Sequence, residues 1–170
     1  KIDEKSDLLK NPNTQRASHY ENNKSEFLGS CNMVKKAGHE DLEILAQLAV
    51  LMWKNHSINE LIDEFSEILD SGKAQFFLKY ENHSPIGFAQ CQLRYDYVEG
   101  TSSSPVGYLE GIFVKEGYRN KGYAKELLAE CEAWAKERGC YEFASDCEID
   151  NINSFHFHEA MNFTEANRII

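Results

Sequence analysis

Apolar residues along the chain recur with two periods, and the alternation between the periods predicts the order of helices and strands. Stripes at helical spacing predict helices over His39–Trp53, from a cap at Ser57 to Leu69, from Ala124 to a stop at Gly139, and over Asn151–Met161. Shorter apolar runs predict strands at Val34–Lys36, Ala74–Tyr80, Ile86–Tyr95, Val106–Val114 and Tyr141–Cys147, and from Phe163 onward. This order predicts an α+β fold, an α/β/α sandwich whose mixed, mostly antiparallel sheet has about six or seven strands and whose helices number about four.

Residues 1–32 differ from the rest because they are polar and have no sustained period. We interpret them as an N-terminal extension, either a fused leader or a remnant of cloning, in front of one domain at 33–170. A short docked helix around Asp7–Lys10 is the one element expected there, without a catalytic role.

The stretch Gly107–Leu128 (GYLEGIFVKEGYRNKGYAKELL) joins an apolar strand to an amphipathic helix through a polar turn. The turn has the spacing R-x-x-G-x-A, with Arg119, Gly122 and Ala124. Small residues before a helix leave backbone N–H groups uncovered, and such a turn can hold a pyrophosphate. An ordinary tight strand–turn–helix is the alternative. The glycine patterns of dinucleotide-binding and P-loop folds are absent from the sequence.

These residues resemble the GCN5-related N-acetyltransferase superfamily, whose acetyl-CoA motif is [RQ]-x-x-G-x-[GA]. The segments RYDYVEGTSSSPVGYLEGIFV and EFASDCEIDNINSFHFHEAMNF further resemble the aminoglycoside 6′-N-acetyltransferases. The resemblance runs from about Met33 to Ile170 and is dense between Tyr95 and Phe163. It implies acetyl-CoA as co-substrate and an aminoglycoside as the acetyl acceptor. No metal is expected, because His156 and His158 are two residues apart and would lie on different faces of a helix.

The resemblance also implies which residues bind the co-substrate. The backbone of Leu109–Val114 would pair with the pantetheine, and Tyr118–Ala124 would hold the pyrophosphate. The residues expected at the acetyl-CoA site are Ile112, Phe113, Val114, Tyr118, Arg119, Asn120, Lys121, Gly122, Tyr123, Ala124 and Asn151.

Two carboxylates stand where an ammonium-bearing substrate would need them. Glu110 interrupts an apolar strand, where a carboxylate is costly unless it faces a solvated cleft, and Asp146 ends the next strand after small residues. The resemblance implies that Trp53, Tyr97, Glu110 and Asp146 line the aminoglycoside site and that Asp146 takes part in proton transfer.

Each of these residues also has a structural alternative. Glu110 could pair with Arg94 or Arg119, and Asp146 could cap the helix that starts near Asn151. Trp53 could be a core residue, and Tyr97 could be an ordinary strand-end side chain.

The last predicted helix departs from the superfamily pattern Y-x-x-x-G-F. His158 stands at the position of the Tyr that protonates the departing thiolate, and an imidazolium could donate that proton. A packed or surface histidine is the alternative. Asn162 replaces the expected Gly and is the next best residue for a left-handed backbone.

Composition limits the remaining choices. The net charge of −10 argues against nucleic acid as substrate and suits a polycationic small molecule. Five scattered cysteines suggest reduced thiols, and no apolar run is long enough to cross a bilayer, so a cytoplasmic protein without membrane contact is expected. The chain stops at Ile170, where family members continue through a last strand that often contacts a partner subunit. We therefore expect a homodimer. Two alternative functions remain: acetylation of another amine, such as a polyamine or a protein N-terminus, and a non-catalytic module that binds CoA or the drug.

Overall fold

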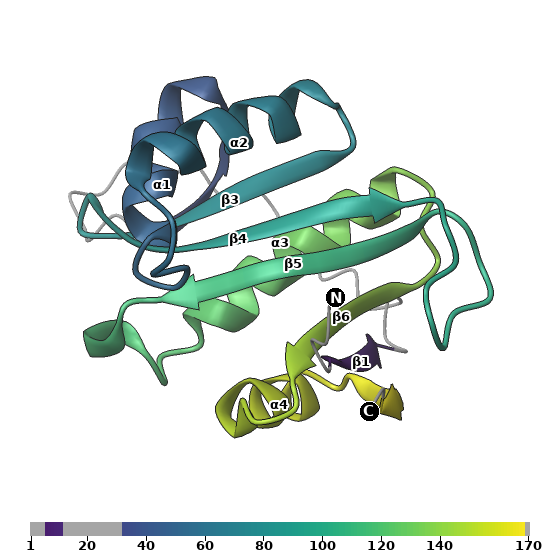
Figure 1. Cartoon of the computed structure of the whole chain (residues 1–170). Coiled ribbons are helices and arrows are strands. Elements are labelled where there is room, and N and C mark those ends of the chain that lie inside the picture. The colour runs from purple at the N-terminus through teal and green to yellow at the C-terminus, as the bar shows by residue number, and fades with distance from the viewer. Residues whose placement is uncertain (1–5, 12–31, 169–170) are drawn as a thin grey trace, which may run out of the picture.

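A twisted sheet forms the centre of the molecule, and helices cover both of its faces (Figure 1). The structure is a computed structural model that describes residues 6–11 and 32–168. The sheet has seven strands in the order β2-β3-β4-β5-β6-β1-β7, and among these only β5 and β6 are neighbours that run parallel. The strands are β1 (Ser6–Asn11), β2 (Asn32–Ala37), β3 (Ala74–Glu81), β4 (Ser84–Arg94), β5 (Val106–Val114), β6 (Phe143–Glu148) and β7 (Thr164–Arg168). The helices are α1 (Leu42–Ala49), α2 (Ile58–Asp70), α3 (Tyr123–Glu137) and α4 (Ile152–Ala160), with 3-10 turns at His39–Asp41 and Glu116–Tyr118.

Alternate strand residues feed two separate cores, one on each face of the sheet. Phe76, Leu78 and Phe88 pack under α1 and α2. Phe77, Ile86 and Cys91 point the other way and pack under α3. The expected three-layer sandwich and its mixed, mostly antiparallel sheet are confirmed.

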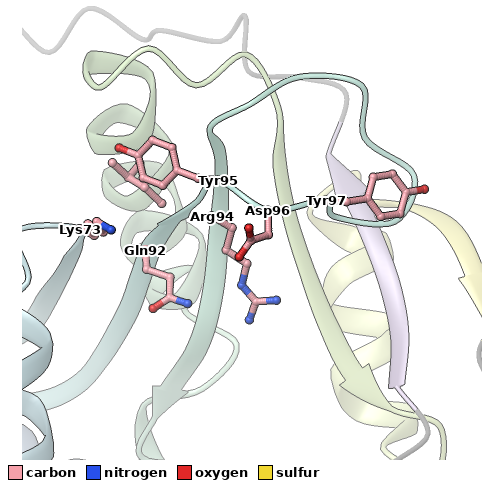
Figure 2. A pocket seen from close by; sticks show the side chains of 7 residues that line it. Lys73, Gln92, Arg94, Tyr95, Asp96 and Tyr97 are labelled. Atoms are coloured by element: carbon pink, nitrogen blue, oxygen red, sulfur yellow. The ribbon is translucent and has the colours of Figure 1, made fainter.

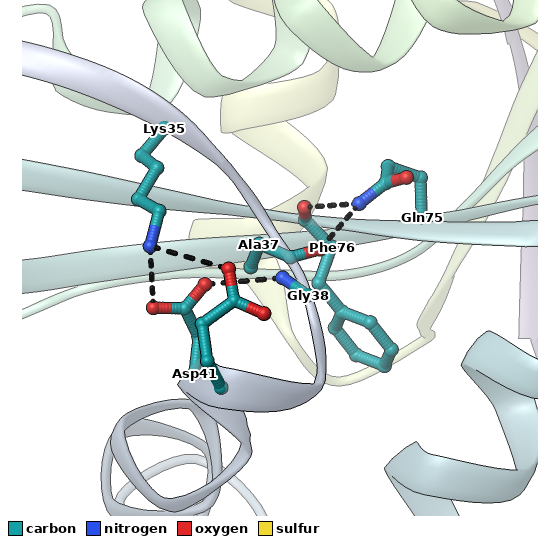
Figure 3. Close-up of polar contacts among 7 residues, drawn as sticks. Lys35, Ala37, Gly38, Asp41, Gln75 and Phe76 are labelled. Carbon is teal, nitrogen blue, oxygen red and sulfur yellow. Dashed lines mark hydrogen bonds and ion pairs between the residues drawn. The ribbon is translucent and has the colours of Figure 1, made fainter.

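A buried carboxylate fixes the start of the first helical segment (Figure 3). Asp41 is only 4% exposed; its carboxylate accepts hydrogen bonds from the Gly38 N–H at 3.0 Å and from the Lys35 ammonium at 2.7 Å. Gln75 ties β2 to β3 nearby, because its side-chain amide donates to the Ala37 carbonyl at 2.7 Å. These contacts fix the turn that leads into α1, and α1 packs against β4.

The sequence predicted the residues that end or cap the helices more accurately than other features. The Ser57 side chain caps α2 in a capping box with Glu60, as expected. Gly139 follows α3 with φ of 84°, and Asn162 follows α4 with φ of 66°, both in the left-handed region. One boundary was wrong: α1 ends at Ala49, and residues 50–56 form turns that carry Trp53 away from the helix.

The N-terminal segment holds a strand where a helix was expected. Ser6–Asn11 is β1; it lies between β6 and β7 and is antiparallel to both. Leu8 stands opposite Asp146 in this register. The helix prediction at Asp7–Lys10 was therefore wrong, because pairing with β6 gives the segment backbone hydrogen bonds that its own sequence does not reveal. The other residues of 1–31, Cys31 among them, and Ile170 lie outside the described residues.

Cys91, Cys131, Cys140 and Cys147 are buried as thiols. No helix in the described part of the chain is long and apolar enough to span a membrane.

Candidate active site at the fork of two parallel strands

The parallel strands β5 and β6 pair over a short stretch and then separate. The pairs are Gly107 with Phe143, Tyr108 with Ala144, and Leu109 with Ser145. Beyond Leu109, β5 continues to Val114 and pairs only with β4 in the described sheet. Glu110 and Asp146 are the first residues past the last pair, one on each arm of this fork.

A β-bulge sets the direction of Glu110. Cys91 of β4 pairs with Leu109, and Gln90 pairs with Gly111, so Glu110 is the extra residue. A bulge bends the strand and turns its side chain out of the regular alternation. This explains how a carboxylate is accommodated inside an otherwise apolar strand.

Glu110 and Trp53 lie in the same cavity, of about 240 Å³, between β4, β5 and the α1–α2 segment. His56, Leu61, Glu64 and Gln90 complete its lining. The Trp53 ring contacts Phe65 and Phe88 edge-on, with centroid distances of 6.2 and 5.8 Å. Trp53 therefore serves the core and the cavity wall at once.

Arg94 forms an ion pair with Glu110, which is one of the two pairings that the sequence left open. Its Nε and Nη2 donate to the same carboxylate oxygen at 3.1 and 2.8 Å, and its guanidinium carbon lies 3.3 Å from the centroid of the Tyr108 ring. Burial raises the pKa of Glu110 above its ordinary value, and the Arg94 charge opposes that rise. Arg119 takes no part, since its Nε donates to the Val114 carbonyl at 2.9 Å.

Asp146 keeps an exposed side chain on the β6 arm of the fork. Burial and the neighbouring Asp146 charge raise the pKa of the Tyr108 hydroxyl well above its usual value, so the tyrosine stays protonated beside the carboxylate. Asp146 does not cap α4: Asn151 does, accepting from the Ser154 N–H at 3.1 Å. The predicted cofactor residue Asn151 thus has a structural task at the start of α4.

Tyr97 lies apart from the smaller cavity. It borders a larger one of about 540 Å³ lined also by Lys73, Gln92, Arg94, Tyr95 and Asp96 (Figure 2). Tyr97 is 76% exposed, and its hydroxyl donates to Glu99 at 3.0 Å. Arg94 links the two cavities, because it lines the larger one and binds Glu110, which lines the smaller one.

The turn before α3 has the geometry that its glycine suggested. Gly122 caps the helix with φ of 85°, and Asn120 has φ of 61°, so two left-handed residues shape the turn. The side chains of Arg119, Asn120 and Lys121 are exposed there. With the β5 edge of Ile112, Phe113 and Val114 leading into it, the turn supplies uncovered amides at the positive end of a 15-residue helix.

A buried lysine of the sheet contacts the first turns of α3, next to this turn. Lys79 of β3 is 0% exposed; its ammonium lies 2.5 Å from Glu126 in the first turns of α3 and 4.8 Å from the centroid of the Tyr123 ring. A hydrogen bond from Tyr123 to Glu81 raises the tyrosine pKa to about 12. Lys121 lies 3.6 Å from the same Glu81 carboxylate. The network ties the start of α3 to β3.

His158 is packed inside the protein, on α4. It is 2% exposed, with Nδ1 2.7 Å from the Ser154 carbonyl and Nε2 2.9 Å from the Ser145 hydroxyl. The carbonyl can only accept, so Nδ1 carries a proton. The Ser145 hydroxyl also lies 3.1 Å from the Leu109 carbonyl, so its single proton is shared between that carbonyl and Nε2. Burial lowers the pKa of His158, against the raising effect of the Ser154 carbonyl and of Asp146. These contacts favour the structural alternative for this residue.

The lowered pKa of His158 predicts acid sensitivity of the fold. Below about pH 6.5 the unfolded chain binds a proton that the folded chain does not, so stability falls as the pH drops through that value. His158→Gln cannot titrate, and its loss of unfolding free energy between about pH 7.5 and pH 5.5 should be smaller than that of the wild type. Chemical denaturation at both pH values measures it; equal losses would contradict the prediction.

Several residues of the two cavities were missed from the sequence, Glu64, Gln90 and Gln92 among them. A signal was present in β4, where Gln90, Gln92 and Arg94 alternate with apolar residues and mark one polar face of the strand. No local signal marks Glu64, whose place depends on how α2 packs. Among the described residues, no group of three or more His, Cys, Asp or Glu side chains is arranged to hold a metal ion.

Comparison with known proteins agrees with this geometry. Residues 42–163 match the Acetyltransferase (GNAT) family. The aminoglycoside N(6′)-acetyltransferase type 1 of Serratia marcescens is 37% identical over 81% of this chain and 95% of its own length. The aminoglycoside N-acetyltransferase AAC(6′)-Iy with CoA has a TM-score of 0.81 and 35% identity, covering 86% of this chain and 96% of its own. The same enzyme with the bisubstrate analogue CoA-S-monomethyl-acetylneamine has a TM-score of 0.78 and 35% identity, covering 82% and 95%. The chain described here belongs to the Acetyltransferase (GNAT) family.

Proposed function

We propose that the protein transfers the acetyl group of acetyl-CoA to the 6′-amine of aminoglycoside antibiotics and so confers resistance. The names of its relatives state this activity. The observation that carries the proposal is the fork, where Glu110 and Asp146 stand on two diverging strands beside an aromatic cavity. Acetylation removes a positive charge from the drug, which weakens its attraction to ribosomal RNA.

The co-substrate fits along one continuous path of backbone. The open β5 edge at Ile112, Phe113 and Val114 would bind the pantetheine amides, and the turn Tyr118–Ala124 would bind the pyrophosphate. Arg119 and Lys121 add positive charge at the exposed turn. The thioester would then lie at the fork, next to Glu110 and Asp146.

The acceptor binds as a cation and must react as a neutral amine. Glu110 and the cavity around Trp53 hold an ammonium-bearing ring, and Tyr97 extends the site into the larger cavity. Asp146, directly or through water, takes a proton from the 6′-ammonium. The amine nitrogen then attacks the thioester carbon and loses its second proton to water. A β5 N–H near Phe113 stabilises the oxyanion, and the C–S bond breaks to release the thiolate.

His158 is not needed as an acid in this scheme. It lies behind Ser145, whose side chain alternates with that of Asp146 along β6, so the two point to opposite faces of the sheet. Solvent can protonate the released thiolate. The role we assign to His158 is to hold α4 against β6.

A thiol-release assay tests the proposal against its two rivals. With acetyl-CoA, we expect turnover of kanamycin and tobramycin and none of spermidine or of a peptide with a free N-terminus. Turnover of spermidine or the peptide alone would favour the first rival. Calorimetric binding of drug and CoA without thiol release would favour the second, a non-catalytic module.

Gly111 gives a sharper test of the acceptor cavity. A Cβ at this position would lie 2.9 Å from Trp53 Cζ2 and 3.0 Å from Met52 Cε, so Gly111→Ala must displace the indole from the cavity wall. Because the drug would lose its packing against Trp53, we expect KM for tobramycin to rise about tenfold. KM for acetyl-CoA should change little. Gly117→Ala, whose added Cβ meets nothing within 4 Å, is the control. An unchanged KM for tobramycin in Gly111→Ala would remove Trp53 from the site.

The domain boundary at residue 33, the homodimer and the cytoplasmic location remain predictions. Size-exclusion chromatography with light scattering tests the dimer, and activity of a chain that begins at Met33 tests the boundary.

A further inference from the structure

Arg94 occupies the place where a positively charged substrate group is needed. Its guanidinium makes two hydrogen bonds to one oxygen of Glu110 and stacks on Tyr108 at 3.3 Å. The same Tyr108 lies beside Asp146. A cation thus lies against one carboxylate of the fork and stacks on the tyrosine that neighbours the other, in a site whose substrate carries several ammonium groups.

The ion pair between Arg94 and Glu110 is partly exposed to water, so Arg94 can leave Glu110 at low cost. The Arg94 side chain is 37% exposed and that of Glu110 is 21% exposed, so water reaches both partners. Partly exposed ion pairs contribute little net free energy, because hydration replaces most of what is lost on separation. The second carboxylate oxygen of Glu110 accepts no hydrogen bond from Arg94.

Space and charge are both present on the far side of Arg94. The larger cavity, of about 540 Å³, begins at Arg94 and contains Asp96 two residues further along the chain (Figure 2). The smaller cavity, with Trp53 and Glu64, lies on the Glu110 side. Arg94 therefore stands between two cavities, and a movement toward Asp96 would leave Glu110 uncovered without stranding a charge.

We propose that Arg94 is a resident cation of the acceptor site, bound to Glu110 in the free enzyme and displaced toward Asp96 by an ammonium group of the substrate. This inference rests on the proposed function. The exchange replaces one cation on Glu110 with another, so the negative charge at the fork is never left unpaired. Arg94 thereby sets the affinity for the aminoglycoside, because each substrate must compete with it.

The test compares two variants that each remove one positive charge from the larger cavity. Arg94→Gln frees Glu110, whereas Lys73→Gln removes a charge that lies over the Tyr95 ring at 5.4 Å. Both raise the general attraction for a cation, and only the first removes the competitor. With CoA-saturated enzyme, we expect the Kd for tobramycin to fall about fivefold in Arg94→Gln and less than about twofold in Lys73→Gln.

A double-mutant cycle assigns the gain to Glu110. In a Glu110→Gln background, Arg94→Gln should no longer tighten tobramycin binding, because no carboxylate is left to release. The proposal is overturned if Arg94→Gln binds tobramycin equally or more weakly while its melting temperature and CoA affinity match the wild type.

A crystal structure of the wild-type enzyme with CoA and tobramycin gives an answer that does not depend on any variant folding. We expect a drug nitrogen about 3 Å from a Glu110 carboxylate oxygen and Arg94 turned toward Asp96. Arg94 still bound to Glu110 beside the drug would overturn the proposal and leave the proposed function standing. A wild-type enzyme that fails to bind or acetylate tobramycin, kanamycin and neomycin would instead contradict the proposed function.

Discussion

Asp146→Asn should lose most of its turnover and keep its affinity for acetyl-CoA. The amide has the shape of the carboxylate and can still bond Tyr108, but it cannot accept a proton from the 6′-ammonium. General-base catalysis typically contributes about 10²- to 10⁴-fold, and we expect kcat for kanamycin to fall within that range. Steady-state kinetics and calorimetry with acetyl-CoA measure the two quantities.

Position, and not charge alone, should decide this effect. Asp150→Asn removes the same charge from the exposed loop after β6 and serves as the control. Its kcat should stay within about twofold of the wild type, as is usual for surface sites away from the chemistry. A normal kcat in Asp146→Asn would exclude Asp146 from proton transfer.

Glu126→Leu should destabilise the fold far more than Lys79→Met. Removing Glu126 strands the Lys79 ammonium at a site with no exposure, whereas removing Lys79 leaves a carboxylate that is 42% exposed and can take up water. Removing one partner of a buried ion pair, so that the other charge is left unpaired, costs about 3–5 kcal/mol of stability. Because Glu126 is partly exposed, we expect Glu126→Leu to cost about 3 kcal/mol. An isosteric apolar replacement of the buried lysine should cost less than about 1 kcal/mol.

Thermal and chemical unfolding test this asymmetry. For a chain of this size, Glu126→Leu should lower Tm by roughly 6–12 °C, and adding Lys79→Met should recover most of the loss. Glu137→Leu, at the exposed end of the same helix, controls for the change of residue type. Equal effects of the two single variants would show that the Lys79 ammonium is not isolated from water.

The parts of the fold that the sequence predicted are those fixed by neighbouring residues. Ser57, Gly139 and Asn162 act on their own helix ends, so their backbone roles could be inferred from position alone. The turn at Gly122 belongs to the same class, because its left-handed backbone needs only a residue without a side chain.

The parts that the sequence did not predict depend on contacts between distant segments. The bulge at Glu110 is defined by the register of β4 against β5, and β1 becomes a strand only because β6 and β7 accept it. The burial of Lys79 reflects the docking of α3 on β3, which a strand pattern cannot reveal. For Glu110, the sequence left two partners open, and the structure selected Arg94.

The most direct test of the account uses two antibiotics that differ at a single group. Neomycin carries an amine at the 6′ position and paromomycin carries a hydroxyl there, while their other amines are the same. With acetyl-CoA, we predict thiol release with neomycin, an N-acetyl group at its 6′ nitrogen by NMR, and no release with paromomycin. Acetylation of paromomycin, or of neomycin at another nitrogen, would contradict the account.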